Sequence, residues 1–327
     1  MNDGHQLGAG SSVYGPIYRD SRDFTPFRNG HVRTQLRRLA EDVGESAAGA
    51  LGGRDPRRLA VLGSVPRLKR MGGKTAKAMH QAIFTSTEPE RLIALGRANP
   101  GWAGLCFVMA GLLSYKQGGY QRAAELLQRG LSLRIDDDAS QFSATYLQTV
   151  VTRVEVAERI DVPVLFSEES VFLALSHCLR ETGRIKEALQ ALGALPPSLP
   201  HALARCTAAQ ALGRHADVDD WTDELLNEDD LSAALLLIRA RSLRALGAFG
   251  GANVALKEVL RRRKTALALR NDAITDRALL ALDAGRFSLS ERARQRQATK
   301  VETVDGISKD VQVRRLWKQD FGEDDAD

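Results

Sequence analysis

The histidines, cysteines and acidic residues are the side chains that could perform chemistry, and their spacing decides what they could do. The six histidines form no His-Glu-x-x-His pair, and no Cys-x-x-Cys occurs that could bind zinc. No Gly-x-Ser-x-Gly element is present either. The acidic run Asp136-Asp-Asp138 lacks the later bidentate glutamate of a calcium loop, so it is better explained as the start of a helix. We therefore expect no catalytic residues, no metal and no cofactor, and predict that the protein is not an enzyme.

Two short motifs hint at phosphate or DNA binding. Gly72-Gly-Lys-Thr75 resembles the end of a phosphate-binding loop, but Leu68 occupies the place of the first glycine and no apolar strand precedes it. Residues Leu39 to Ser46 resemble the first helix and turn of a helix-turn-helix. The second helix would be Ala47 to Gly53, which has none of the polar side chains that read base edges. We therefore favour a small helical lead-in at 39–53 and no nucleotide site at 72–75.

Charge is arranged in blocks that the small net value of +5 conceals. Residues 28–80 carry a balance of +8, residues 81–253 of −5, residues 254–296 of +6 and residues 297–327 of −3. This pattern predicts a flexible basic arm with short helices over 1–80, a folded domain over 81–297 and an acidic, disordered tail over 298–327. Within the arm, Val61 to Met71 mixes apolar and basic residues. A solvated linker is the favoured interpretation, and contact of 28–80 with nucleic acid or of 61–71 with an anionic membrane is the alternative.

Neither a membrane-spanning helix nor a signal peptide is expected. The most apolar run, Ala103 to Leu113, is shorter than the roughly 20 residues that a spanning helix needs. Residues 1–30 have no uninterrupted apolar core. Cys106, Cys178 and Cys206 lie far apart in the sequence, which fits reduced thiols. A cytoplasmic location is therefore predicted.

A glycine followed two positions later by a bulky residue recurs along the chain, each time between two helical patterns. Successive glycines are separated by 65, 30, 34 and 38 residues, so the period is near 34. Such a period predicts helix-turn-helix units in which glycine supplies the turn. The pairs are Gly118 and Tyr120, Gly183 and Ile185, Gly213 and His215, Gly247 and Phe249, and Gly285 and Phe287.

Residues Tyr115 to Leu133 are similar to the consensus of the tetratricopeptide repeat family, with Gly111 and Ala123 at the small-residue positions where two helices cross. The units that follow match more weakly, and bulky or small apolar residues such as Phe107 and Ala202 replace the consensus tryptophan. The resemblance covers roughly residues 90–297. It implies an all-α fold, an antiparallel helix-hairpin superhelix, with helices at 75–84 and 89–98 as caps.

The gap of 65 residues leaves room for a further element between the first two units. Residues Ala139 to Ile160 carry an apolar stripe typical of one long helix, formed by Leu147, Val151, Val154 and Ala157. The runs Thr149-Val-Val-Thr and Val154-Glu-Val are also typical of a strand. The helix is the favoured interpretation.

The resemblance also implies a concave surface lined by the first helix of each unit, and hence a docking groove for a peptide or domain. Its polar, mostly basic side chains suit an acidic partner or a C-terminal carboxylate, whereas a solvated helix face is the simpler interpretation of the same residues. The Lys and Asn pair that some family members use to clamp a chaperone tail is absent, because Leu173 and His177, or Leu203 and Thr207, hold those places. The predicted function is a scaffold or adaptor; the alternative is a regulator whose basic arm contacts nucleic acid. The groove positions are His177, Thr207 and Arg241 on one row, with Arg180, Gln210 and Arg244 one turn later.

The basic run Arg261-Arg-Arg-Lys264 ends the fourth unit. Cations at a helix C-terminus are stabilised by the helix dipole, and this explanation is preferred over nucleic-acid contact.

Overall fold

The computed structural model describes residues 57–69, 73–193, 195–223 and 225–284. They fall into two compact units, an N-terminal unit up to Ala208 and a C-terminal unit from Ala209. The DNA-motif candidate at 39–53, the last repeat glycine Gly285 with Phe287, and the acidic tail lie outside the described residues. Within the part of the chain that the structure describes, no helix is both long and apolar enough to cross a membrane.

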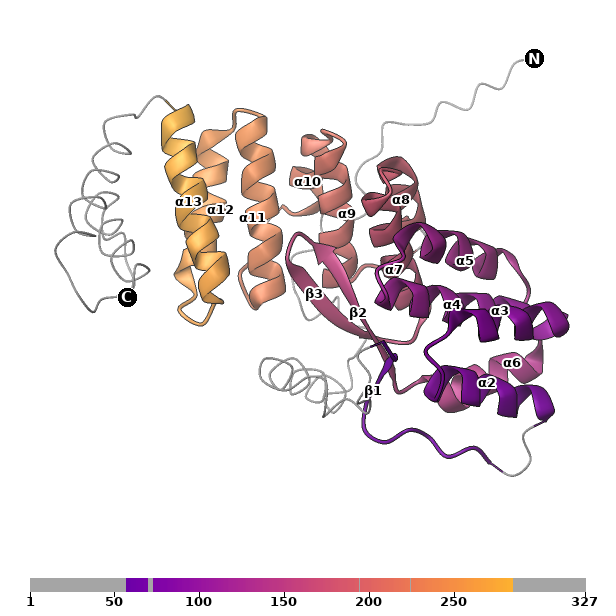
Figure 1. Ribbon diagram of the computed structural model, residues 1–327. Coiled ribbons are helices and arrows are strands. Elements are labelled where there is room, and N and C mark those ends of the chain that lie inside the picture. The colour runs from indigo at the N-terminus through magenta and orange to yellow at the C-terminus, as the bar shows by residue number, and fades with distance from the viewer. Residues whose placement is uncertain (1–56, 70–72, 194, 224, 285–327) are drawn as a thin grey trace, which may run out of the picture. The chain divides into compact units, whose positions relative to one another are not determined.

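Helices dominate both units, as the all-α prediction requires (Figure 1). The N-terminal unit also holds a three-stranded sheet and two short helical turns, the 3₁₀ turn Pro100–Trp102 and the π turn Ser143–Leu147. Its main elements are β1 (Ala60–Val61), α2 (Lys74–Phe84), α3 (Pro89–Ala98), α4 (Ala103–Lys116), α5 (Tyr120–Ser132), α6 (Asp137–Phe142), β2 (Val150–Ala157), β3 (Ile160–Leu165), α7 (Glu168–Glu181), α8 (Ile185–Leu192) and most of α9 (Leu199–Ala211). The C-terminal unit holds α10 (His215–Trp221), α11 (Asp230–Ala245), α12 (Phe249–Arg261) and α13 (Leu267–Asp283).

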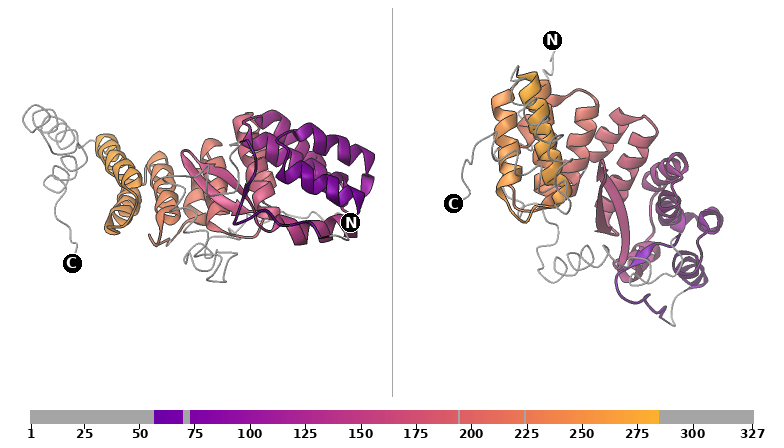
Figure 2. Two further views of the ribbon diagram at one scale, coloured as in Figure 1. Left: turned by 60° about the horizontal axis from the view of Figure 1, so that its bottom comes forward. Right: turned by 60° about the vertical axis from the view of Figure 1, so that its left-hand side comes forward.

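Four of the five repeat glycines lie in the described residues, and all four adopt the left-handed conformation, with φ between 72° and 79°. In each turn, the N–H of the residue after the glycine donates to a carbonyl five residues earlier, as Gly119 does to Ser114 and Ala248 to Leu243. This is the hydrogen bond of a Schellman C-cap, which satisfies a carbonyl that the helix leaves free. The next helix begins at the bulky residue two positions after the glycine, at Tyr120, Ile185, His215 and Phe249. The predicted helix-turn-helix series is confirmed over these residues, and Figure 2 shows it from two further sides.

The crossing of α4 and α5 depends on small residues. A Cβ atom on Gly111 would lie 2.7 Å from the Leu127 side chain, and one on Gly130 would lie 2.8 Å from the backbone nitrogen of Val108. Ala123 is fully buried in the same interface. The prediction that Gly111 and Ala123 occupy close-approach positions is therefore confirmed, and Gly130 is a third such position that the sequence did not reveal.

The prediction of one long helix over 139–160 was wrong. Helix α6 and the π turn end at Leu147, and the chain then forms β2 and β3, an antiparallel hairpin in which Val151 lies opposite Leu165. Five valines and alanines of β2 are buried, from both faces of the strand. Leu147, Val151 and Val154 also recur at a spacing of three to four residues, so the same stretch fits a helical stripe. The strand alternative is the one that the structure adopts.

Part of the predicted arm belongs to the N-terminal unit. Residues Ala60 and Val61 form β1, which pairs antiparallel with Val151 and Val150, and Val61 is buried. The Nε2 atom of His80 lies 2.7 Å from the Pro66 carbonyl, and the Lys69 N–H donates to the Tyr146 hydroxyl. The folded part of the chain thus begins before the predicted limit at residue 81. The remaining limits, at 297 and 298, stay predictions.

Replacing Gly130 by alanine should destabilise the N-terminal unit by about 1–3 kcal/mol, because the new methyl group meets backbone atoms that cannot rotate away. In an open helix the same change would stabilise by up to about 1 kcal/mol, so the sign of the effect tests the crossing. Gly250→Ala in α12, read from α12 peptides, is the control, since no atom lies within 4 Å of its added Cβ. Hydrogen exchange of α4 and α5 peptides under increasing urea measures the change. The same change in protection in both variants would contradict the close approach.

Candidate partner-binding surface

His177, the first predicted groove residue, lies beneath β2 with only 3% of its surface exposed. Its Nδ1 atom is 2.6 Å from the Tyr115 hydroxyl of α4. Its Nε2 atom is 3.4 Å from a Glu181 carboxylate oxygen and 4.0 Å from one of Glu155. The Tyr120 ring of α5 packs against the imidazole at 5.2 Å between centroids. The side chain is therefore enclosed by the protein itself and presents no surface to a partner.

The titration of this cluster is shaped mainly by burial. Burial lowers the pKa of His177, and Arg180 adds to that effect, while Glu155, Glu181 and Asp161 oppose it. Burial likewise raises the pKa of the Tyr115 phenol above its usual range, a direction that keeps it protonated. The neutral forms of both rings are therefore favoured at neutral pH.

Arg180, one turn later on α7, is also bound to β2. Its Nη1 atom donates to the Val156 carbonyl at 2.9 Å. Val156 sits where the register of β2 and β3 shifts between Glu155 and Ala157, so its carbonyl belongs to a bulge. His177 and Arg180 therefore both contact β2, a strand where the sequence predicts a helix.

The side chains of Thr207 and Gln210 on α9 each donate hydrogen bonds to groups within their own unit. The Thr207 hydroxyl donates to the Leu203 carbonyl at 2.7 Å, one turn earlier in the same helix. Gln210 belongs to the C-terminal unit, where its amide nitrogen donates to the Ile238 carbonyl and the Ser242 hydroxyl. Both residues are half-buried.

Arg241 and Arg244 on α11 are part-exposed and face carboxylates of α13. Arg241 Nε lies 2.7 Å from Asp276, and its Nη2 atom lies 4.0 Å from Asp272. Arg244 pairs with Asp283. Burial raises the pKa of Asp276, and the Arg241 guanidinium opposes that rise. The predicted basic row is therefore an Arg–Asp ladder between α11 and α13, in which acidic side chains offset the positive charge.

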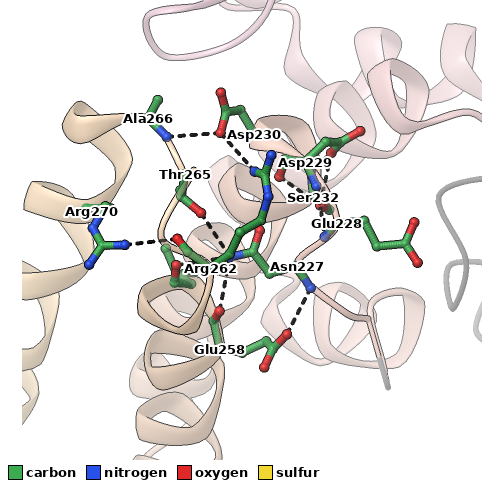
Figure 3. A network of polar contacts seen from close by, with 11 residues as sticks. Asn227, Glu228, Asp229, Asp230, Ser232, Glu258, Arg262, Thr265, Ala266 and Arg270 are labelled. Carbon is green, nitrogen blue, oxygen red and sulfur yellow. Dashed lines mark hydrogen bonds and ion pairs between the residues drawn. The ribbon is translucent and has the colours of Figure 1, made fainter. Parts of the chain in front are cut away.

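A buried asparagine joins the start of α11, the helix that carries the ladder arginines, to the end of α12 (Figure 3). The Asn227 side-chain nitrogen lies 3.0 Å from the carbonyls of Glu258 and Val259 and 3.2 Å from the Thr265 hydroxyl. Its backbone N–H donates to the Glu258 carboxylate. Carbonyls in the last turn of a helix lack intrahelical partners, so Asn227 caps α12 from the loop that precedes α11. The network fixes the start of α11 against the end of α12.

Asp230 joins the same region to the loop before α13. Its Oδ1 atom accepts the Ala266 N–H at 3.0 Å and pairs with Arg262 at 3.3 Å, as Figure 3 shows. Arg261, which ends α12, pairs with Glu258. Two cations of the basic run Arg261 to Lys264 thus have intramolecular acidic partners at the helix end.

The remaining sequence motifs have structural roles where they are described. Asp137 and Asp138 lie in the first turn of α6, as expected for an acidic helix start. Thr75 lies in the first turn of α2 and its hydroxyl donates to Asn99, whereas Gly72 lies outside the described residues.

The cysteines and acidic side chains form no reactive cluster in the described residues. Cys106, Cys178 and Cys206 are buried and free, and burial raises the pKa of each thiol to about 12. Thiolates are the reactive form of cysteine, so these environments disfavour nucleophilic chemistry. No group of three or more His, Cys, Asp or Glu side chains in the described ranges could hold a metal ion.

Comparison with known proteins gives one structural likeness. No family model matches the chain, and no curated protein matches it. A solved structure, the N-terminal domain of the EccA1 ATPase from the ESX-1 secretion system of Mycobacterium tuberculosis, is 16% identical with a TM-score of 0.48. The match covers 71% of this chain and 86% of that one.

Removing the Tyr115 hydroxyl should destabilise the N-terminal unit by about 1–3 kcal/mol. In Tyr115→Phe, the Glu155 N–H and the His177 Nδ1 atom both lose their buried partner. Tyr120→Phe is the matched control, because Tyr120 contacts the same imidazole through its ring. Urea unfolding read by hydrogen exchange of α7 peptides gives both values. A loss no larger than that of the control would show that the hydroxyl does not fasten β2.

Asn227→Ala should destabilise the C-terminal unit by a similar amount, about 1–3 kcal/mol, since it leaves the Glu258 and Val259 carbonyls without their cap. Asn253→Ala, in the body of α12, serves for comparison and should change the unfolding free energy by less than about 0.5 kcal/mol. Hydrogen exchange of α11 and α12 peptides reports the difference. Indistinguishable variants would refute a capping role.

Proposed function

We propose that this protein is a non-enzymatic interaction module whose partner docks on the α11–α13 face of the C-terminal unit. The observation that carries the proposal is the Arg–Asp ladder, because Arg241 and Arg244 keep 39% and 30% of their side chains exposed. On α7 of the N-terminal unit, by contrast, His177 and Arg180 already contact residues of β2. Of the six predicted groove residues, the proposal therefore keeps the two arginines on α11.

The energetics of exposed ion pairs support exchange at this face. An exposed pair contributes only about 0–1 kcal/mol, so a partner's carboxylates can replace Asp272 or Asp283 at small cost. Both aspartates are exposed, at 56% and 42%, and stay available for a partner's basic side chains. The ladder therefore suits a peptide that offers carboxylates to the two arginines and a cation beside them.

The absence of a catalytic step is part of the proposal. It is supported by the buried thiols, whose raised pKa values disfavour thiolates, and by the enclosure of His177. These are the side chains that would otherwise supply a nucleophile or a base.

The double variant Arg241→Gln with Arg244→Gln tests the docking face. Glutamine is preferred to glutamate because an acidic residue at 241 would face Asp276 and Asp272 and could unfold the unit. We expect affinity capture of the cross-linked full-length protein to recover a partner with wild type and at least tenfold less with the double variant. Arg263→Gln with Lys264→Gln removes the same charge from two exposed positions after α12 and should capture normally.

Equal capture by both double variants would overturn the docking face. Recovery of nucleic acid in place of a protein, lost on nuclease treatment or in a chain lacking residues 1–56, would favour the regulator alternative.

A further inference from the structure

The outer edge of β2 requires hydrogen-bond partners that helices supply. The Phe166 N–H donates to the Val150 carbonyl, so the backbone N–H and C=O groups of the even-numbered residues of β2 point toward β3. The backbone groups of the odd-numbered residues then point to the opposite edge of β2, where Val151 pairs with β1. β1 is only two residues long, and farther along this edge the Glu155 N–H donates to the Tyr115 hydroxyl at 3.2 Å. A tyrosine side chain thus stands where a neighbouring strand would be.

The positions of the protons follow from this contact. The Tyr115 oxygen accepts the Glu155 N–H, so the phenol hydrogen is free to point at His177 Nδ1, 2.6 Å away. Nδ1 must then be the unprotonated nitrogen, and the imidazole hydrogen resides on Nε2, toward Glu181 and Glu155. The chain runs from the backbone of β2 through Tyr115 to a neutral His177.

We propose that His177 is a proton-sensitive latch that fastens the β2–β3 hairpin to α4 and α7. A proton on Nδ1 would place two hydrogens between this nitrogen and the Tyr115 oxygen. Either the Tyr115 hydroxyl then turns its hydrogen away from His177, or Tyr115 and His177 move apart. Both changes weaken the hydrogen bond that Tyr115 accepts from the Glu155 N–H. Acid thereby favours local opening of the hairpin end near the bulge.

The charged groups around His177 act in both directions. On α7, Arg180 opposes a positive ring and Glu181 favours it; Glu155 of β2 and Asp161 of β3 also favour it. α4 and α5 contribute the phenols of Tyr115 and Tyr120, which stay neutral. Burial is the largest influence and lowers the pKa of His177. A lowered pKa in the closed state means that stability is lost as pH falls below about 6.5, the value for a solvated histidine.

The test combines the tautomer of His177 with amide exchange of Glu155 in the full-length protein. Nitrogen NMR of the imidazole at pH 7.5 should show hydrogen on Nε2 and none on Nδ1. After correction for intrinsic rates, the protection of the Glu155 amide should be nearly constant above pH 7 and fall by up to about tenfold between pH 7.5 and 5.5, as the uptake of one proton on opening requires.

Two histidine variants separate this latch from other effects of acid. His177→Gln should abolish the pH dependence at Glu155, whereas His80→Gln, in the same unit but bound to Pro66, should leave it intact. His201 is a second buried histidine whose pKa is lowered to about 4, and amides of α9 report its contribution separately. Hydrogen on Nδ1 at pH 7.5, a flat wild-type profile or an unchanged profile in His177→Gln would each overturn the proposal. If that variant does not fold, the tautomer and the wild-type profile decide alone.

Discussion

The architecture depends on one backbone constraint, the left-handed turn that ends the first helix of each hairpin. A helix ends with carbonyls that have no partner, and a residue with positive φ lets the following N–H groups reach back to them. Glycine adopts this conformation without steric cost, which explains why Gly118, Gly183, Gly213 and Gly247 share it. The turn reverses the chain within two residues, so the next helix must pack antiparallel on the last. Close crossings such as that of Gly111 with Leu127 then become possible.

The sequence predicts these hairpins well because the turn and both helices lie within about thirty residues of one another. The sequence predicts a helix where β2 lies because the strand depends on pairing with distant segments of the chain. Val150 and Val151 pair with residues 60–61 on one side and with the chain near Leu165 on the other. The alternation of Val154, Glu155 and Val156 is typical of a strand, but the spacing of Leu147, Val151 and Val154 equally fits a helix, so the local pattern alone could not decide. If residues 150–157 form a helix, nothing in the sequence indicates that a strand covers this face of α7. The repeat pattern then predicts that His177 and Arg180 line an open groove, whereas both contact β2.

The Arg–Asp ladder was missed for a different reason. The basic positions on α11 followed from the repeat, but their charge balance depends on carboxylates 35 and 39 residues later. Asp272 and Asp276 are four residues apart on α13, the spacing of neighbours on one helix face, and Arg241 and Arg244 are three apart on α11. These spacings could have suggested facing rows of opposite charge, whereas counting cations on one helix could not.

The buried polar cluster is a consequence of inserting a strand among helices. A helix satisfies its own backbone groups, but the edge of a strand has donors and acceptors that need partners from elsewhere. In this protein the partners at the end of β2 are the side chains of Tyr115 and Arg180. A phenol that accepts a backbone N–H must place its own hydrogen somewhere, and a buried histidine can accept it only while neutral. The titratable group beneath the sheet therefore follows from the hydrogen-bonding needs of a strand edge, and a structural solution of this kind carries pH sensitivity with it.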